Sequence, residues 1–126
     1  MATRTEQLFG TVLVVEDSII ISLDTADTLR DLGFEDVIVA RTSAEALAAL
    51  ADGLAFRAVV LDLDLDGESA TPVARAARAA GLPVIVASGH ADPGLDPAFQ
   101  GAPRLRKPYA REALAQALFQ ALGIPG

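Results

Sequence analysis

Five short runs of apolar and β-branched residues recur along the chain, separated by longer stretches that mix apolar and polar positions. Within the runs the apolar character is continuous rather than alternating, which is typical of strands covered on both faces in a parallel sheet. We predict strands at residues 11–15, 36–40, 58–61, 83–87 and 102–106, of which the last has the weakest pattern.

The longer stretches have the features of helices. Thr42 followed by Glu45 is a capping-box pattern, and Gly33 and Gly53 suit helix ends. Near the C-terminus, leucines four residues apart form one apolar stripe. We predict helices at residues 18–32, 42–53, 67–81 and 109–123.

The connection between the fourth and fifth strands departs from this pattern. Pro93, Gly94 and Pro97 oppose a long helix, so we expect a short or irregular fourth helix there. The alternation of strands and helices predicts a doubly wound α/β fold with one mostly parallel sheet. We expect one domain at residues 10–123, an N-terminal extension at 1–9 and a C-terminal tail at 124–126.

Composition and charge exclude several classes of function. The chain has 126 residues, 52% of them hydrophobic, which is enough for one core. A net charge of -7 opposes binding to nucleic acid or to an anionic membrane surface. The absence of cysteine and the single histidine exclude disulfides, thiolate catalysis and a multi-histidine zinc site. No apolar run reaches the roughly 18 residues of a membrane span and no signal peptide is evident, so we expect a cytoplasmic protein.

Polar residues follow the predicted strands. Glu16 and Asp17 come after the first strand, Asp62 after the third, Ser88 after the fourth and Lys107 after the fifth. Because the carboxyl ends of parallel strands meet at one edge, where α/β proteins bind ligands, we expect these side chains to converge.

Such a group of side chains suits phosphoryl chemistry. Clustered carboxylates repel one another, and Mg²⁺ relieves the repulsion while binding carboxylates, water and phosphate. A lysine and a hydroxyl supply a charge and a donor for phosphoryl oxygens. An aspartate is also a competent nucleophile for forming an aspartyl phosphate.

Four motifs in this order resemble the receiver domains of bacterial two-component response regulators: VLVVEDS, VVLDLDLDGES, VASGH and LRKPY. The resemblance covers about residues 10–122. It implies a flavodoxin-like, five-stranded parallel sheet with strand order 2-1-3-4-5.

The resemblance also implies the metal site. Asp17 would bind Mg²⁺ directly, together with Asp62, and Glu16 would bind it mostly through water. The backbone carbonyl of Asp64 would complete the site, while Asp66 with Gly67 is expected to form the turn that follows.

For the phosphoryl group, the resemblance implies that Asp62 is the acceptor. Lys107 would pair with a phosphoryl oxygen, and Ser88 would follow the phosphoryl group and report its presence. His90 and the side chain of Asp64 lie where they could tune the phosphoryl lifetime.

In this family the phosphoryl group comes from the phosphohistidine of a sensor histidine kinase or a histidine phosphotransfer protein, and the first helix docks the kinase. Nothing follows the last predicted helix except Ile-Pro-Gly, so we expect a stand-alone receiver. Its output would be protein binding, to an unknown downstream protein, or phosphotransfer. We expect no turnover enzyme, but a switch that promotes its own phosphorylation and dephosphorylation.

Two features concern the switch. The fourth strand is similar to the Phe-Ala-Thr-Gly group of single-domain alphaproteobacterial receivers, with Ser88 in place of threonine and valines in place of both phenylalanines. Many receivers have an aromatic residue three positions before the lysine, where this chain has Arg104. We therefore expect the signal to travel by ordering of residues 91–101 rather than by rotation of a ring.

Three alternatives remain open. Asp62, Asp64, Asp66 and Gly67 match the start of a calcium-binding EF-hand loop, but its twelfth position is Val73 instead of glutamate. The Asp-x-Asp pattern also resembles small haloacid-dehalogenase-like Mg²⁺-dependent phosphatases. A receiver-like interaction module that never meets phosphate is the third alternative.

Overall fold

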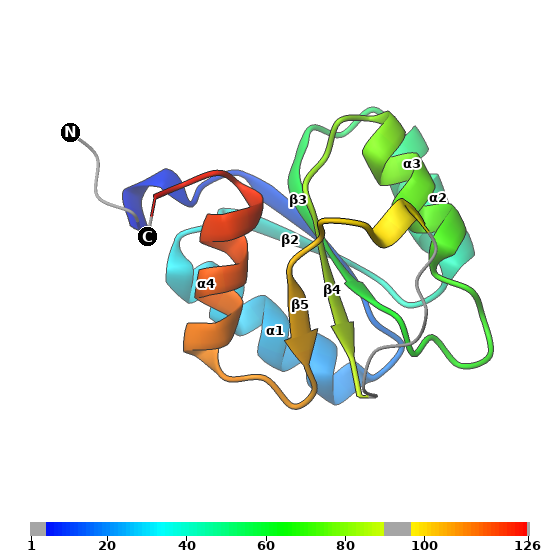
Figure 1. Cartoon of the computed structure of the whole chain (residues 1–126), viewed down its shortest axis with the longest axis horizontal. Helices are drawn as coiled ribbons and strands as arrows, with labels where there is room; N and C mark the ends of the chain where they lie inside the picture. Colours follow the sequence, from blue (N-terminus) through cyan, green and yellow to red (C-terminus); the bar gives the residue numbers. More distant parts are fainter. Residues whose placement is uncertain (1–4, 90–96, 126) are drawn as a thin grey trace.

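The computed structural model describes residues 5–89 and 97–125, which form a five-stranded parallel sheet with helices on both faces (Figure 1). The strand order is β2-β1-β3-β4-β5, which confirms the predicted flavodoxin-like topology. The strands are β1 Thr11–Val15, β2 Asp36–Ala40, β3 Phe56–Asp62, β4 Val84–Ser88 and β5 Arg104–Arg106. The helices are α1 Ile19–Leu32, α2 Ser43–Ala51, α3 Thr71–Ala79 and α4 Arg111–Ala121, with 3-10 helices η1 Thr5–Gln7 and η2 Pro97–Phe99.

The sheet separates two hydrophobic layers. Successive strand residues point to opposite faces, so Val12 packs in the cluster with α1 and α4, whereas Leu13 packs in the cluster with α2 and α3. Figure 1 shows the two pairs of helices on opposite sides of the strands. Leu8 and Ile124, near the two ends of the chain, are both buried in the α1 and α4 layer.

Helix termini follow the local sequence. Ser18 caps α1, its hydroxyl accepting from the backbone N–H of Ile21 at 3.3 Å. Thr42 caps α2 in the same way, accepting from the N–H of Glu45 at 3.1 Å, which confirms the predicted capping residue. Gly33 ends α1 with φ of 125°, a conformation that side chains with a Cβ rarely adopt.

The third helix starts later than predicted, at Thr71 instead of Gly67. Glu68 and Ser69 are held instead by α2: the Glu68 carboxylate accepts from the backbone N–H of Ser43 at 2.8 Å, and the Ser43 hydroxyl donates to the Ser69 carbonyl at 3.0 Å. These contacts between distant residues keep the end of the β3–α3 loop out of the helix.

The connection between β4 and β5 has only the short helix η2 among its described residues, as expected for a short or irregular fourth helix. Arg78 of α3 donates to the carbonyls of Ala98 and Gln100, and Ala98 and Phe99 are buried. Residues 90–96 lie outside the described part, so the expectation for residues 91–101 is not tested there. Within the ranges described, no helix has the length and apolar character needed to cross a membrane.

Candidate functional site

The register of the sheet places the predicted site residues at one edge. Val15 of β1 pairs with Leu61 of β3, so Glu16 and Asp62 each follow directly on this pair. Asp62 in turn pairs with Ala87 of β4, next to Ser88. The structure thus brings the ends of these strands together at the carboxyl edge of the sheet.

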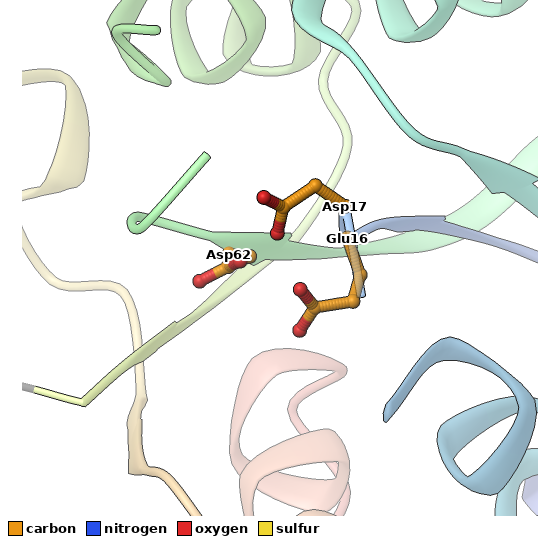
Figure 2. A group of neighbouring side chains, drawn as sticks. All are labelled: Glu16, Asp17 and Asp62. Carbon is orange, nitrogen blue, oxygen red and sulfur yellow. The ribbon is translucent and has the colours of Figure 1, made fainter. Parts of the chain in front are cut away.

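Three carboxylates gather at this edge. Glu16, Asp17 and Asp62 each place a carboxylate oxygen within 4.8 Å of the others. Figure 2 shows these side chains beside the ends of β1 and β3. Glu16 and Asp62 are only 3% and 2% exposed, whereas Asp17 is half-buried. Among the described residues, this is the acidic group with the geometry of a cation site.

Lys107 joins the two buried acids. Its Nζ lies 2.9 Å from Glu16 Oε1 and 2.9 Å from Asp62 Oδ1. The backbone holds it there, because the Lys107 N–H donates to the carbonyl of Ser88 at 2.9 Å. The peptide bond to Pro108 is cis. One ammonium therefore compensates two carboxylates in a site with little access to water.

The charges of this cluster influence one another. Burial raises the pKa of the Glu16 carboxyl to about 7, the neighbouring Asp62 adds to the rise and Lys107 opposes it. Burial also disfavours ionised Asp17, but contacts with Glu16 and with backbone N–H groups outweigh it and lower the pKa. Burial alone would lower the pKa of Lys107. Its bonds to Glu16 and Asp62 outweigh burial, so the pKa of Lys107 is raised above its ordinary value. The site therefore holds a charged lysine beside a carboxyl that titrates near neutrality.

The two oxygens of Asp62 differ. Oδ1 accepts from Lys107 and from the backbone N–H of Asp64, at 2.9 Å each. Oδ2 is buried and has no hydrogen-bond partner within the described residues. A buried carboxylate oxygen without a partner is costly. A divalent cation bound among Glu16, Asp17 and Asp62 would satisfy this oxygen, so the residues fit a hard metal such as Mg²⁺.

The β3–α3 loop packs against the cluster. The N–H of Asp66 donates to Asp17 Oδ2 at 3.3 Å. Asp66 and Gly67 form the turn between Leu65 and Glu68, with Gly67 at φ of 77°, as predicted.

The other predicted residues lie on β4 and β5 or outside the described part of the chain. Ser88 ends β4 and is half-buried, and Arg104 is exposed on β5, where it pairs with Val86. His90 is not among the described residues. The hydroxyl of Tyr109 lies 2.7 Å from Thr25 Oγ1, a link between α1 and the chain after Lys107 that no sequence pattern indicates.

The chain matches solved structures, whereas no family model and no curated protein matches it. A response regulator receiver protein from Sinorhizobium medicae WSM419 is 31% identical, with a TM-score of 0.78 over 90% of this chain and 94% of that one. SdrG from Sphingomonas melonis Fr1 is 34% identical, with a TM-score of 0.77 over 92% and 98%. The BeF3-activated conformation of SdrG from Pseudomonas melonis Fr1 is 35% identical, with a TM-score of 0.75 over 97% and 99%.

Fold and site together define a flavodoxin-like α/β domain with an acidic, lysine-containing edge. Several solved receivers share this fold at more than 30% identity over nearly their whole length. The chain belongs to the response regulator receiver family. Membership in the narrower Phe-Ala-Thr-Gly group stays a prediction from the fourth strand.

Proposed function

We propose that this receiver is a Mg²⁺-dependent phosphoacceptor in which Asp62 takes a phosphoryl group. The observation that carries the proposal is the state of Asp62. The residue is 2% exposed, its Oδ1 is bound by Lys107, and its Oδ2 lacks a partner among the described residues beside two further acids. For an aspartate with only a structural role, the combination of an ammonium, two neighbouring carboxylates and an unpaired buried oxygen would be costly and without benefit to the fold.

Glu16, Asp17, Asp62 and the backbone carbonyl of Asp64 would hold the metal. When bound, Mg²⁺ supplies positive charge that lowers the repulsion between the carboxylates and an incoming phosphate. Lys107, whose Nζ lies 2.9 Å from Asp62 Oδ1, would stabilise the negative charge as it moves from the aspartate to the outer phosphoryl oxygens. Because Asp62 is buried, its carboxylate has little hydration to lose before it bonds to phosphorus.

In the transfer step, an Asp62 carboxylate oxygen forms a bond to phosphorus while the phosphorus–nitrogen bond of a phosphohistidine breaks. The departing imidazole nitrogen keeps the electron pair of that bond, and the ring leaves as neutral imidazole because its other nitrogen carries a proton. The product would be a mixed anhydride on Asp62, and we expect its outer oxygens to bind Lys107 and the hydroxyl of Ser88. Water can later hydrolyse the anhydride, which makes the protein a switch and not an enzyme with continuous turnover.

The donor would be a sensor histidine kinase or a histidine phosphotransfer protein. The start of α1 offers an apolar docking surface beside the site, because Ile19, Ile20 and Leu23 are 54%, 79% and 61% exposed. Output would go to a downstream protein. The acidic net charge of -7 supports a protein as partner over nucleic acid.

Intact mass after incubation with Mg²⁺ and phosphoramidate tests the proposal. We expect one phosphoryl adduct on the wild type, and none without Mg²⁺ or on Asp62→Asn. No adduct and no beryllofluoride binding under any condition would favour the phosphate-independent module. Continuous hydrolysis of a phosphate ester would favour the phosphatase.

A further inference from the structure

The side chain of Asp64 links the two loops at the mouth of the site. Its Oδ2 accepts from the backbone N–H of Gly89 at 2.7 Å, while its own N–H donates to Asp62 Oδ1 at 2.9 Å. Asp62 pairs with Ala87 in the sheet, so Asp64 and Gly89 each lie two residues beyond that pair. The Asp64 carboxylate therefore lies across the carboxyl edge, between the ends of β3 and β4.

This contact uses a donor that an anion on Asp62 would need. A phosphoryl group brings three oxygens to the mouth, and each requires a donor or a cation. The Lys107 ammonium lies 2.9 Å from Asp62 Oδ1. Ser88 and Gly89 directly follow Ala87, the residue that pairs with Asp62, so we expect the Ser88 hydroxyl and the Gly89 N–H to be the further donors. The Asp64 carboxylate is an acceptor of the same charge and hydrogen-bonding type as a phosphoryl oxygen, and it already accepts from Gly89.

We propose that the Asp64 carboxylate is a built-in competitor of the phosphoryl group for the N–H of Gly89. The inference rests on the proposed function of Asp62. Before phosphorylation, Asp64 holds Gly89 and ties the β3–α3 loop to the end of β4. An anion on Asp62 displaces the Asp64 carboxylate, and this breaks the tie. The cost of the displacement weakens anion binding and makes the release of the loop depend on phosphorylation.

The alternative is that Asp64 only staples the two loops. A staple and a competitor respond in opposite ways to removal of the side chain. Loss of a staple loosens the site and weakens anion binding, whereas loss of a competitor strengthens it. Asp66 offers a matched control, because it carries the same charge on the same loop, is exposed, and contacts Asp17 through its backbone N–H and not its carboxylate.

The test is the dissociation constant for beryllofluoride, measured by NMR titration of the full chain at saturating Mg²⁺. We compare the wild type with Asp64→Ala, Asp64→Asn and Asp66→Asn, using Asp62→Asn as the blank.

We expect Asp64→Ala to bind beryllofluoride about tenfold tighter than the wild type, since a charge-assisted hydrogen bond no longer has to be displaced. Asp64→Asn, which keeps a weaker neutral acceptor, should lie between Asp64→Ala and the wild type. Asp66→Asn should stay within about twofold of the wild type, because an exposed charge is screened. The Gly89 amide signal should move on beryllofluoride addition in the wild type.

Three results overturn the inference. If the wild type binds beryllofluoride and Asp64→Ala binds equally or more weakly, Asp64 is a staple and the proposed function of Asp62 stands. If Asp64→Asn and Asp66→Asn gain equally, general charge repulsion explains the effect and competition for Gly89 does not. If the wild type does not bind beryllofluoride at all, the proposed function fails together with the inference.

Discussion

The amino and carboxyl edges of the sheet differ in the burial and pairing of their charged side chains. At the amino edge, Arg57 of β3 stacks 4.2 Å above the centre of the Phe9 ring and donates to the backbone carbonyls of Gln7 and Phe9 at 3.1 and 3.4 Å. Phe9 is 52% exposed. One cation thus fastens the segment before β1 at the surface, with no acid buried beside it in any described contact.

At the carboxyl edge, two acids are buried and share one lysine. Taking charges out of water costs several kcal/mol per ion, and apolar residues of similar volume often stabilise a fold more. At the amino edge, the contacts of Arg57 hold the segment before β1 without such a cluster. The carboxyl edge therefore carries a cost that stability does not explain, and the proposed binding of a metal and a phosphoryl group would account for it.

The largest effect expected from this contrast is that of Lys107→Met. The substitution leaves Glu16 and Asp62 facing each other without a cation, and removing one partner of a buried pair costs about 3 to 5 kcal/mol. We expect a loss of about 3 kcal/mol in the free energy of unfolding at pH 8, measured by urea denaturation.

Arg111→Met is the matched control for Lys107→Met. Arg111 pairs with Asp31 at 3.2 Å, but both side chains are at least half exposed. Removal of this exposed pair should cost less than about 1 kcal/mol. Equal losses for the two variants would contradict the assignment of a special energetic role to the carboxyl edge.

Addition of Mg²⁺ should stabilise the protein by nearly as much. A ligand at one hundred times its dissociation constant adds about 2.7 kcal/mol to the free energy of unfolding. Asp17→Asn should remove most of this gain, whereas Asp66→Asn should keep it, as judged by thermal unfolding with and without Mg²⁺ at pH 7.5. Equal gains in both variants would place the metal elsewhere.

Glu16 should make the stability of the metal-free protein depend on pH. Its pKa is about 7 in the folded state and near 4.5 in an unfolded chain, so the folded state binds more protons between these values. Stability should therefore fall as pH rises from about 4.5 to 7, by at most about 1.4 kcal/mol per pH unit for one group. Glu16→Gln should flatten this slope in urea unfolding series. A slope unchanged in Glu16→Gln would show that another group causes it.

The smallest effect belongs to the amino edge. Arg57→Ala removes a cation–π contact and hydrogen bonds near the surface, which should cost about 0.5 to 1 kcal/mol. It should leave phosphorylation and Mg²⁺ binding unchanged. A loss of phosphorylation in a folded Arg57→Ala protein would mean that the two edges are coupled, and the contrast between them would fail.

Much of the fold could be predicted because its signals are local. β1 and β2 have the predicted bounds, since each contains a run of apolar, largely β-branched residues. β3 starts at Phe56, earlier than predicted. The polar Arg57 interrupts the apolar pattern, so the sequence did not indicate the first residues of this strand. The Arg57 side chain contacts the segment before β1 instead of the core. β5 is shorter, Arg104–Arg106, because Pro103 has no N–H to donate to a ladder.

The place of the site was also predictable, because topology alone sends the carboxyl ends of the strands to one edge. The individual bonds were not. The contact of Asp64 with Gly89 joins residues 25 apart, and that of Thr25 with Tyr109 joins residues 84 apart. Such contacts depend on side-chain conformations in the folded molecule, and no local pattern of residue types indicates them.

The most direct test of the central claim is to locate the phosphoryl group on the chain. After reaction with phosphoramidate and Mg²⁺, borohydride reduces an acyl phosphate of aspartate to homoserine, which tandem mass spectrometry of peptides identifies. We predict homoserine at position 62 and nowhere else. Homoserine at Asp17, Asp64 or Asp66, or no homoserine in a protein that carries the adduct, would contradict the assignment of Asp62 as the phosphoacceptor.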